Sequence, residues 1–100
     1  MNRWECVAVK AVGYLLEYYD SGNRYIHARP VANAIDVDGK HAGHSLVLLH
    51  DEGLLEQWSS NTRYTLYTIP ETFPDEVTES AYYDPDEHAE TLRAVRGEGV

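Results

Sequence analysis

The sequence predicts an α+β fold in which a three-helix core is followed by a β-hairpin. Apolar residues recur at three- and four-residue steps over residues 2–19, 30–35 and 39–51, which is the spacing of one buried helical face. Two short runs with strand character follow at 54–58 and 64–69, separated by polar turn residues. A chain of 100 residues is long enough for one domain with one modest core.

The first predicted helix, residues 2–19, has a start signal and a stop signal. Asn2 can cap it, and Glu5 stands three residues later, where a capping-box acid belongs. The turn residues 20–23 end it. The single cysteine, Cys6, cannot form an intramolecular disulfide, and its apolar neighbours indicate a small buried hydrophobe.

Two further helices are predicted close together, joined by a tight turn at residues 36–39. A short extended piece at 25–28 leads into a helix over residues 30–35, and Pro30 suits its first turn because no N–H is needed there. Its inward residues are Val31, Ala32 and Ile35. Asp38 is a good N-cap for the next helix, 39–51. The residues expected to face inward from that helix are Ala42, Leu46 and Leu49.

The hairpin should complete a domain over residues 1–69. Gly53 is free to adopt the left-handed conformation that ends the preceding helix, and residues 59–62 form the hairpin turn. Residues 70–100 are expected to be an acidic linker, up to residue 84, and a short C-terminal helix over 84–96. Asp84 and Pro85 give that helix a strong start, with acids in its first turn.

Two helices joined by a short turn form a helix-turn-helix unit, whose second helix can enter the DNA major groove. The inward positions leave Lys40, His41, His44 and Val47 facing outward, and the glycines let a backbone approach closely. The predicted contacts from this helix are Gly39, Lys40, His41, Gly43, His44 and Val47. The hairpin tip, 59–63, should lie along the DNA backbone or in the minor groove, through Ser60, Asn61, Thr62 and Arg63.

The net charge of −9 opposes DNA binding, but its distribution matters more than its sum. Residues 64–100 carry nine acids against two arginines, whereas residues 24–63 have a net charge of −1. The acidic third should therefore point away from DNA. Lysine is scarce, with only Lys10 and Lys40, and many acids with little lysine are typical of a halophile's cytoplasm. In molar salt the Debye length is about 3 Å, so distant acids would barely repel DNA.

The segment Tyr25 to Ile69 resembles the winged-helix transcription regulators of archaea and bacteria. Residues 48–56, LLHDEGLLE, are similar to the widespread ending of their recognition helix. Trp58 and the hairpin residues around it resemble the wing of small haloarchaeal members. The resemblance implies a winged helix-turn-helix fold, double-stranded DNA as partner and a role in transcription regulation. The chain departs from the family in its recognition helix, where several Arg, Lys, Ser or Thr residues are usual.

Other functions find less support. No glycine-rich phosphate loop, nucleophile motif or paired-carboxylate motif stands out, so we expect no enzymatic activity, no cofactor and no metal. A winged domain that binds another protein without DNA is the alternative. A homodimer through the first or the last helix is a further expectation. No apolar run approaches the ~20 residues of a membrane span, and no N-terminal leader is visible, so a cytoplasmic protein without membrane contact is predicted.

Overall fold

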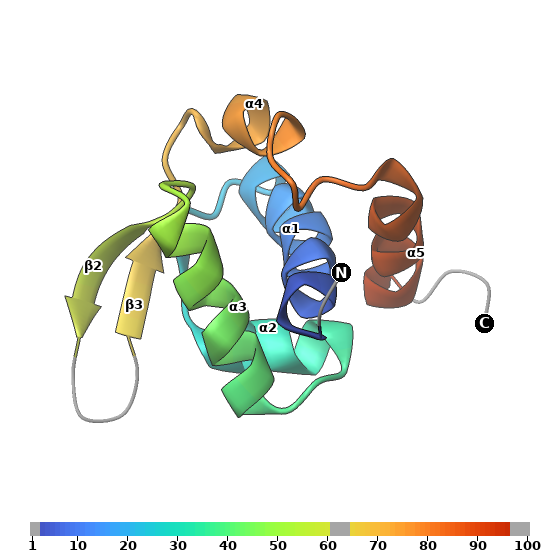
Figure 1. Cartoon of the computed structure of the whole chain (residues 1–100), viewed down its shortest axis with the longest axis horizontal. Helices are drawn as coiled ribbons and strands as arrows, with labels where there is room; N and C mark the ends of the chain where they lie inside the picture. Colours follow the sequence, from blue (N-terminus) through green and yellow to red (C-terminus); the bar gives the residue numbers. More distant parts are fainter. Residues whose placement is uncertain (1–2, 61–64, 97–100) are drawn as a thin grey trace.

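The fold is built around one long helix, α1 (Arg3–Asp20), which lies between α3 and α5 (Figure 1). The computed structural model describes residues 3–60 and 65–96, and within them the chain is α+β with a small antiparallel sheet. The other helices are α2 (Ala28–Ile35), α3 (Gly39–Asp51), α4 (Phe73–Thr78) and α5 (Pro85–Arg96). The strands are β1 (Tyr25–Ile26), β2 (Glu56–Ser60) and β3 (Thr65–Thr68).

α1 is buried on two sides because α3 and α5 pack against it from different directions. The sequence predicted one apolar stripe, and the structure shows a wider buried face made of Val7, Ala8, Val9, Ala11, Val12 and Leu15. Cys6 is exposed, contrary to prediction. It stands four residues before the exposed Lys10, and both line a shallow pocket beside Asp84 and Glu87 at the start of α5.

The turn between α2 and α3 is held by local hydrogen bonds. Asp36 takes the left-handed conformation, with φ 56°, and ends α2. The Val37 N–H then donates to the Ala32 carbonyl at 3.1 Å. α2 begins at Ala28, two residues before the predicted start, which leaves Pro30 in its first turn. Proline is tolerated there because the first N–H groups of a helix have no partner within it.

The sheet has the strand order β1-β3-β2, with all pairs antiparallel. β2 begins at Glu56 and not at Leu54, because Leu54 and Leu55 turn into the core with exposures of 4% and 2%. Gly53, with φ 78°, makes this possible by adopting the expected left-handed conformation after α3. The register shifts between Gln57 and Ser59, so Trp58 lies in a bulge.

The predicted extended linker between residues 70 and 84 is wrong over residues 73–78, which form α4. Phe73 and Val77 stand four residues apart on one face of α4, and both are wholly buried in the common core. Tyr82, after α4, is also buried. Burial of these side chains anchors the segment despite its acidic composition.

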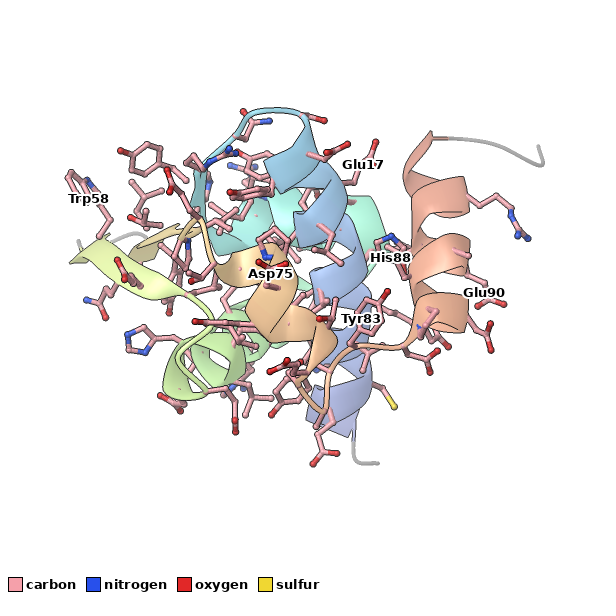
Figure 2. The ribbon with its side chains drawn as sticks, turned by 90° about the horizontal axis from the view of Figure 1, so that it is seen from above. Glu17, Trp58, Asp75, Tyr83, His88 and Glu90 are labelled. Carbon is pink, nitrogen blue, oxygen red and sulfur yellow. The ribbon has the colours of Figure 1, made fainter. Side chains whose placement is uncertain are left out.

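α5 packs on α1 of its own chain (Figure 1). The predicted cap is confirmed, since the Asp84 carboxylate accepts hydrogen bonds from the N–H groups of Asp86 and Glu87 at 3.0 and 3.3 Å. Figure 2 shows His88 on the side of α5 that faces α1, while Glu90 points away. A Cβ on Gly13 of α1 would lie 3.2 Å from the Thr91 Cβ and 3.3 Å from the His88 Cα, so the two helices approach closely there.

Among the described residues, no helix is both long and apolar enough to cross a membrane.

Candidate functional site

α3 has one buried face and one exposed face, as its sequence spacing predicts. Ala42, Leu46 and Leu49 are wholly buried. Lys40 and His44 are exposed, and Val47 is 44% exposed, which is high for an apolar side chain. Gly39 is exposed at the start of the helix, whereas His41 and Gly43 are half-buried. The structure therefore places all six residues singled out on α3 at or near its solvent side.

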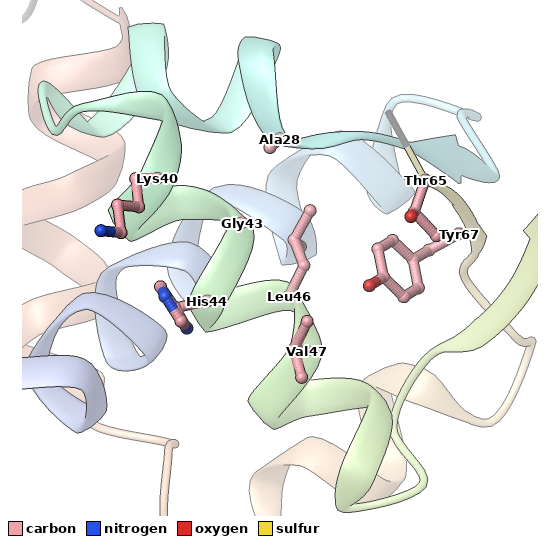
Figure 3. Close-up of a pocket in the computed structure, with 8 residues that line it drawn as sticks. All are labelled: Ala28, Lys40, Gly43, His44, Leu46, Val47, Thr65 and Tyr67. Atoms are coloured by element: carbon pink, nitrogen blue, oxygen red, sulfur yellow. The ribbon is translucent and has the colours of Figure 1, made fainter. Parts of the chain in front are cut away.

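A hollow of about 320 Å³ lies between α3 and β3 (Figure 3). Its α3 wall consists of Lys40, Gly43, His44, Leu46 and Val47. Ala28, at the start of α2, and Thr65 and Tyr67, from β3, form the opposite wall. We call this space the α3–β3 hollow. It joins basic and apolar groups of the exposed α3 face to the base of the hairpin.

The first turn of α3 is capped by its own chain. The Asp38 Oδ1 accepts hydrogen bonds from the N–H groups of Lys40 at 2.8 Å and His41 at 3.1 Å. The bond from the His41 N–H, helped by the charges of His41 and Lys40 and opposed by desolvation, lowers the pKa of the Asp38 carboxyl. Because Asp38 already occupies these two N–H groups, an anion near this end would be bound chiefly by side chains.

Tyr67 contributes a neutral phenol to the hollow. Burial, and to a lesser degree the charge of Asp51, raises the pKa of Tyr67. Its ring is buried, with an exposed fraction of 6%, and its centroid lies 5.8 Å from that of His50. At neutral pH the Tyr67 hydroxyl is thus a hydrogen-bond donor beside Leu46 and Val47 (Figure 3).

Gly43 is not required by packing within the chain. A Cβ at this position would meet only the Ala28 Cβ, at 3.9 Å, which is ordinary van der Waals contact. Glycine within a helix costs up to about 1 kcal/mol relative to alanine. The glycine therefore weakens α3 and leaves the wall of the hollow open.

We expect Gly43→Ala to raise the free energy of unfolding by about 0.5–1 kcal/mol, because alanine restricts the unfolded chain and favours the helix. Urea denaturation followed by circular dichroism measures this. Gly53→Ala is the matched control, and it should destabilise, since Gly53 has φ 78° and an alanine there would be strained. A loss of stability in Gly43→Ala would mean that the α3–α2 contact is tighter than the structure shows.

Of the four residues predicted to contact DNA from the hairpin tip, the structure describes only Ser60. Ser60 is the last residue of β2, and its backbone pairs with Thr65. Asn61, Thr62 and Arg63 lie outside the described residues, so their predicted DNA contacts stay predictions.

Sequence reasoning missed a second hollow, of about 730 Å³, beside the start of α3. It lies between α2 and the turn that leads to α3, and its polar lining includes His27, Arg29, Asn33 and Asp38. The sequence signal that could have found it is the pair His27 and Arg29, which stand just before Pro30. Among the described residues, two exposed cationic side chains, Arg29 and Lys40, therefore lie around the start of α3.

Residues 3–60 and 65–96 contain no group of three or more His, Cys, Asp or Glu side chains arranged to hold a metal ion. Comparison of the chain with protein families, curated proteins and solved structures found no match.

Proposed function

We propose that this chain is a winged helix-turn-helix domain that binds double-stranded DNA as a transcription regulator. α3 would enter the major groove, and the β2–β3 hairpin would lie along the backbone or in the minor groove. The observation that carries the proposal is the exposed α3 face, where Lys40, His44 and Val47 border a hollow that opens toward the hairpin strands.

The chemistry of this face suits a base edge and the phosphates beside it. Lys40 can reach a guanine or a phosphate, and His44 can donate or accept at either. Val47 offers an apolar contact for a thymine methyl group. Gly43 leaves room for close approach, because it lines the hollow without a side chain of its own.

The position of the α5 acids weakens the main objection to DNA binding. α4 and α5 carry most of the acids of the last third, including Asp75 and Glu90. Figure 1 shows α1 between α3 and α5, so the α5 acids lie on the other side of the central helix from the α3 face. This arrangement supports the expectation that the acidic third points away from the bound phosphates.

The test compares the two lysines of the chain. Lys40→Ala should weaken binding to duplexes of any sequence and reduce the slope of log K against log salt by about one. Lys10→Ala is the matched control, with the same charge change on α1 beside Asp84 and Glu87. It should leave the slope nearly unchanged. Arg63→Ala, at the hairpin tip, should act like Lys40→Ala.

Mobility-shift titrations with random and genomic duplexes, from low salt to molar potassium chloride, provide the measurement. Equal losses for Lys40→Ala and Lys10→Ala would show a diffuse electrostatic attraction and contradict binding through α3. No shift at any salt concentration would contradict DNA binding altogether.

A protein-binding adaptor is the second candidate, and one observation favours it. Tyr25 and Trp58 are 49% and 63% exposed, and their rings meet edge to face with centroids 5.7 Å apart. Exposed aromatic residues are enriched in protein–protein interfaces. If the chain is a protein-binding adaptor, Trp58→Ser should abolish capture of its protein partner. If the chain binds DNA through α3, the same substitution should leave duplex binding intact.

The proposal includes a homodimer, but the structure restricts which surface of the chain could form its interface. α5 covers one side of α1 in its own chain, so a second subunit would have to use another surface. Light scattering of the full chain tests it, and a monomeric mass would contradict it.

A further inference from the structure

The α3–β3 hollow has a buried floor beneath an exposed rim. Lys40 and Val47 belong to the rim, and both are exposed. Leu46 and Tyr67 line the same hollow but are only 0% and 6% exposed, so they form its floor. The edge of a base pair can contact the rim, whereas only a small group that enters the hollow can reach the floor. The volume of about 320 Å³ is at the lower end of the range for small-molecule sites.

Tyr67 places on this floor a polar group that the chain itself does not use. Within residues 3–60 and 65–96, the Tyr67 hydroxyl takes part in no hydrogen bond. Its oxygen is nevertheless open to the hollow, because in the same residues His88 Nδ1 is the only fully buried side-chain nitrogen or oxygen without a partner. Figure 3 shows the hydroxyl end of the ring directed toward α3 and Val47. Since buried polar groups nearly always have a partner, a hydroxyl on so deeply buried a side chain points to a ligand acceptor.

The middle of the hollow is apolar and open. Ala28 and Gly43 line it, and Leu46 lies beneath them on the floor. The missing side chain of Gly43 is not required by packing, because a Cβ there would stand at an ordinary 3.9 Å from the Ala28 Cβ. A flat apolar ring can therefore lie against the backbone of α3 at this position.

The two ends of the hollow differ in charge. Figure 3 shows Lys40 on one side of Gly43 and Tyr67 on the other. Lys40 is the only lysine or arginine among the described residues that line the hollow. Burial, and to a lesser degree the charge of Asp51, raises the pKa of Tyr67, so a further negative charge is disfavoured at that end. An anionic group of a ligand therefore belongs at the Lys40 end, and an uncharged oxygen at the Tyr67 end.

We infer that the α3–β3 hollow binds a small aromatic carboxylate. Its carboxylate pairs with the Lys40 ammonium, which the flexible lysine stem can bring over the hollow. Its ring lies on Gly43 and Leu46, and an uncharged oxygen opposite the carboxylate accepts a hydrogen bond from the Tyr67 hydroxyl. The few polar groups of the site thus fix the orientation of the ligand, while the apolar middle supplies most of the contact area.

Resting on the function proposed above, occupancy of the hollow and binding of duplex DNA exclude each other. The ligand neutralises Lys40 and lies beside Val47, and both of these rim residues would contact DNA. A ligand that binds only the DNA-free chain shifts the equilibrium away from the DNA complex by mass action. The chain is thus a regulator that an aromatic carboxylate releases from DNA.

The test uses three probes that share one ring and differ at its ends. 4-Hydroxybenzoate carries the carboxylate and the opposite oxygen, benzoate lacks the opposite oxygen, and 4-hydroxybenzamide lacks the charge. Amide NMR spectra of the full chain should show binding of 4-hydroxybenzoate with a Kd on the order of 1 mM or tighter, as suits so small a ligand. The signals of Gly43, Val47 and Tyr67 should move together. Those of Lys10 and Glu90, away from the hollow, should stay in place.

Two substitutions assign the ends of the ligand. Tyr67→Phe should weaken 4-hydroxybenzoate about two- to tenfold, through loss of one hydrogen bond, and leave benzoate unchanged. Lys40→Gln should weaken both carboxylates about two- to fivefold and leave the amide unchanged. Tyr25→Phe and Lys10→Gln make the same changes outside the hollow and should alter no affinity. Urea denaturation checks the fold of each variant, and loss of an unpartnered hydroxyl from Tyr67 should not lower stability.

Fluorescence anisotropy with a labelled duplex then measures the exclusion. The ligand is added at about ten times its Kd, and sodium chloride balances the ionic strength of the reference sample. The apparent affinity of the unaltered chain for the duplex should fall about tenfold. Tyr67→Phe should respond less at the same ligand concentration, whereas Tyr25→Phe should respond fully. An unchanged duplex affinity in the presence of bound ligand would overturn the exclusion.

The site and the proposed function fail in different ways. Absence of probe binding at about 10 mM, shifts spread evenly over the chain, or equal effects of Tyr67→Phe and Tyr25→Phe would overturn the site and leave DNA binding intact. A chain that binds 4-hydroxybenzoate through Tyr67 and Lys40 but binds no duplex would support the site and refute the proposed function.

Discussion

Phe73→Ala should lower the free energy of unfolding by about 3–5 kcal/mol, which is the usual range for deleting a buried aromatic ring. Phe73 is the largest wholly buried side chain among the described residues, and it belongs to the same core cluster as Leu15, Leu46 and Leu49. Because a domain of this size is stable by only about 5–15 kcal/mol, the variant would lie close to global unfolding. Urea denaturation followed by tryptophan fluorescence and circular dichroism measures the loss.

Glu71→Ala controls for the chain segment, because Glu71 is exposed two residues before Phe73. Its effect should stay within about 0.5 kcal/mol. If residues 70–84 were instead a solvated linker, the two variants would be equally stable, and the packing of α4 described above would be wrong.

Leu46→Ala should cost about 2–5 kcal/mol, the second largest expected effect. Leu46 is 0% exposed, and the helices α1 and α2 both pack on α3. The neighbouring residues cannot fill the lost volume without moving α3, so much of the cost is a cavity term. The midpoint of urea denaturation should fall while the slope of the free energy against urea stays constant.

Val47→Ala is the partner experiment, since Val47 follows Leu46 in the chain but is 44% exposed. Its stability should change by less than about 1 kcal/mol, because little of its area is removed from water. The pair separates the two faces of α3. A larger loss in Val47→Ala than in Leu46→Ala would mean that the helix is rotated from its described position.

α3 could be predicted to the residue because its signals are local. Asp38 caps its first turn, and Gly53 allows the chain to turn away after its last residue. The spacing of Ala42, Leu46 and Leu49 defines its inner face. Each of these depends on residues within one turn of one another. The same holds for the start of α5, where Asp84 makes the predicted cap.

α4 could not be predicted from composition, because tertiary burial outweighs its acidic surroundings. A helix of six residues has no stability of its own and forms where its apolar side chains find a core. The available signals were the four-residue spacing of Phe73 and Val77, Pro74 in the first turn, and the acids Asp75 and Glu76. The exposure of Cys6 was missed for a related reason, since sequence alone does not say which sides of α1 other helices will cover.

The candidate site was predicted on α3 but not beyond it. The spacing within one helix sufficed to place Lys40, His44 and Val47 on a common exposed side. The opposite wall of the hollow, with Thr65 and Tyr67, depends on how β3 packs across from α3. Contacts between segments so distant in the chain are set by the whole core, and no local pattern encodes them.

The two-residue strand β1 has a consequence for the order in which the chain assembles. Tyr25 and Ile26 pair only with Thr68 and Tyr67 of β3, so this part of the sheet closes a loop of about forty residues. Because the entropy of closing a long loop must be met before its contacts stabilise it, β1 should join after α2, α3 and the hairpin have formed. Mutations in this strand pair should therefore speed unfolding and leave the folding rate nearly unchanged.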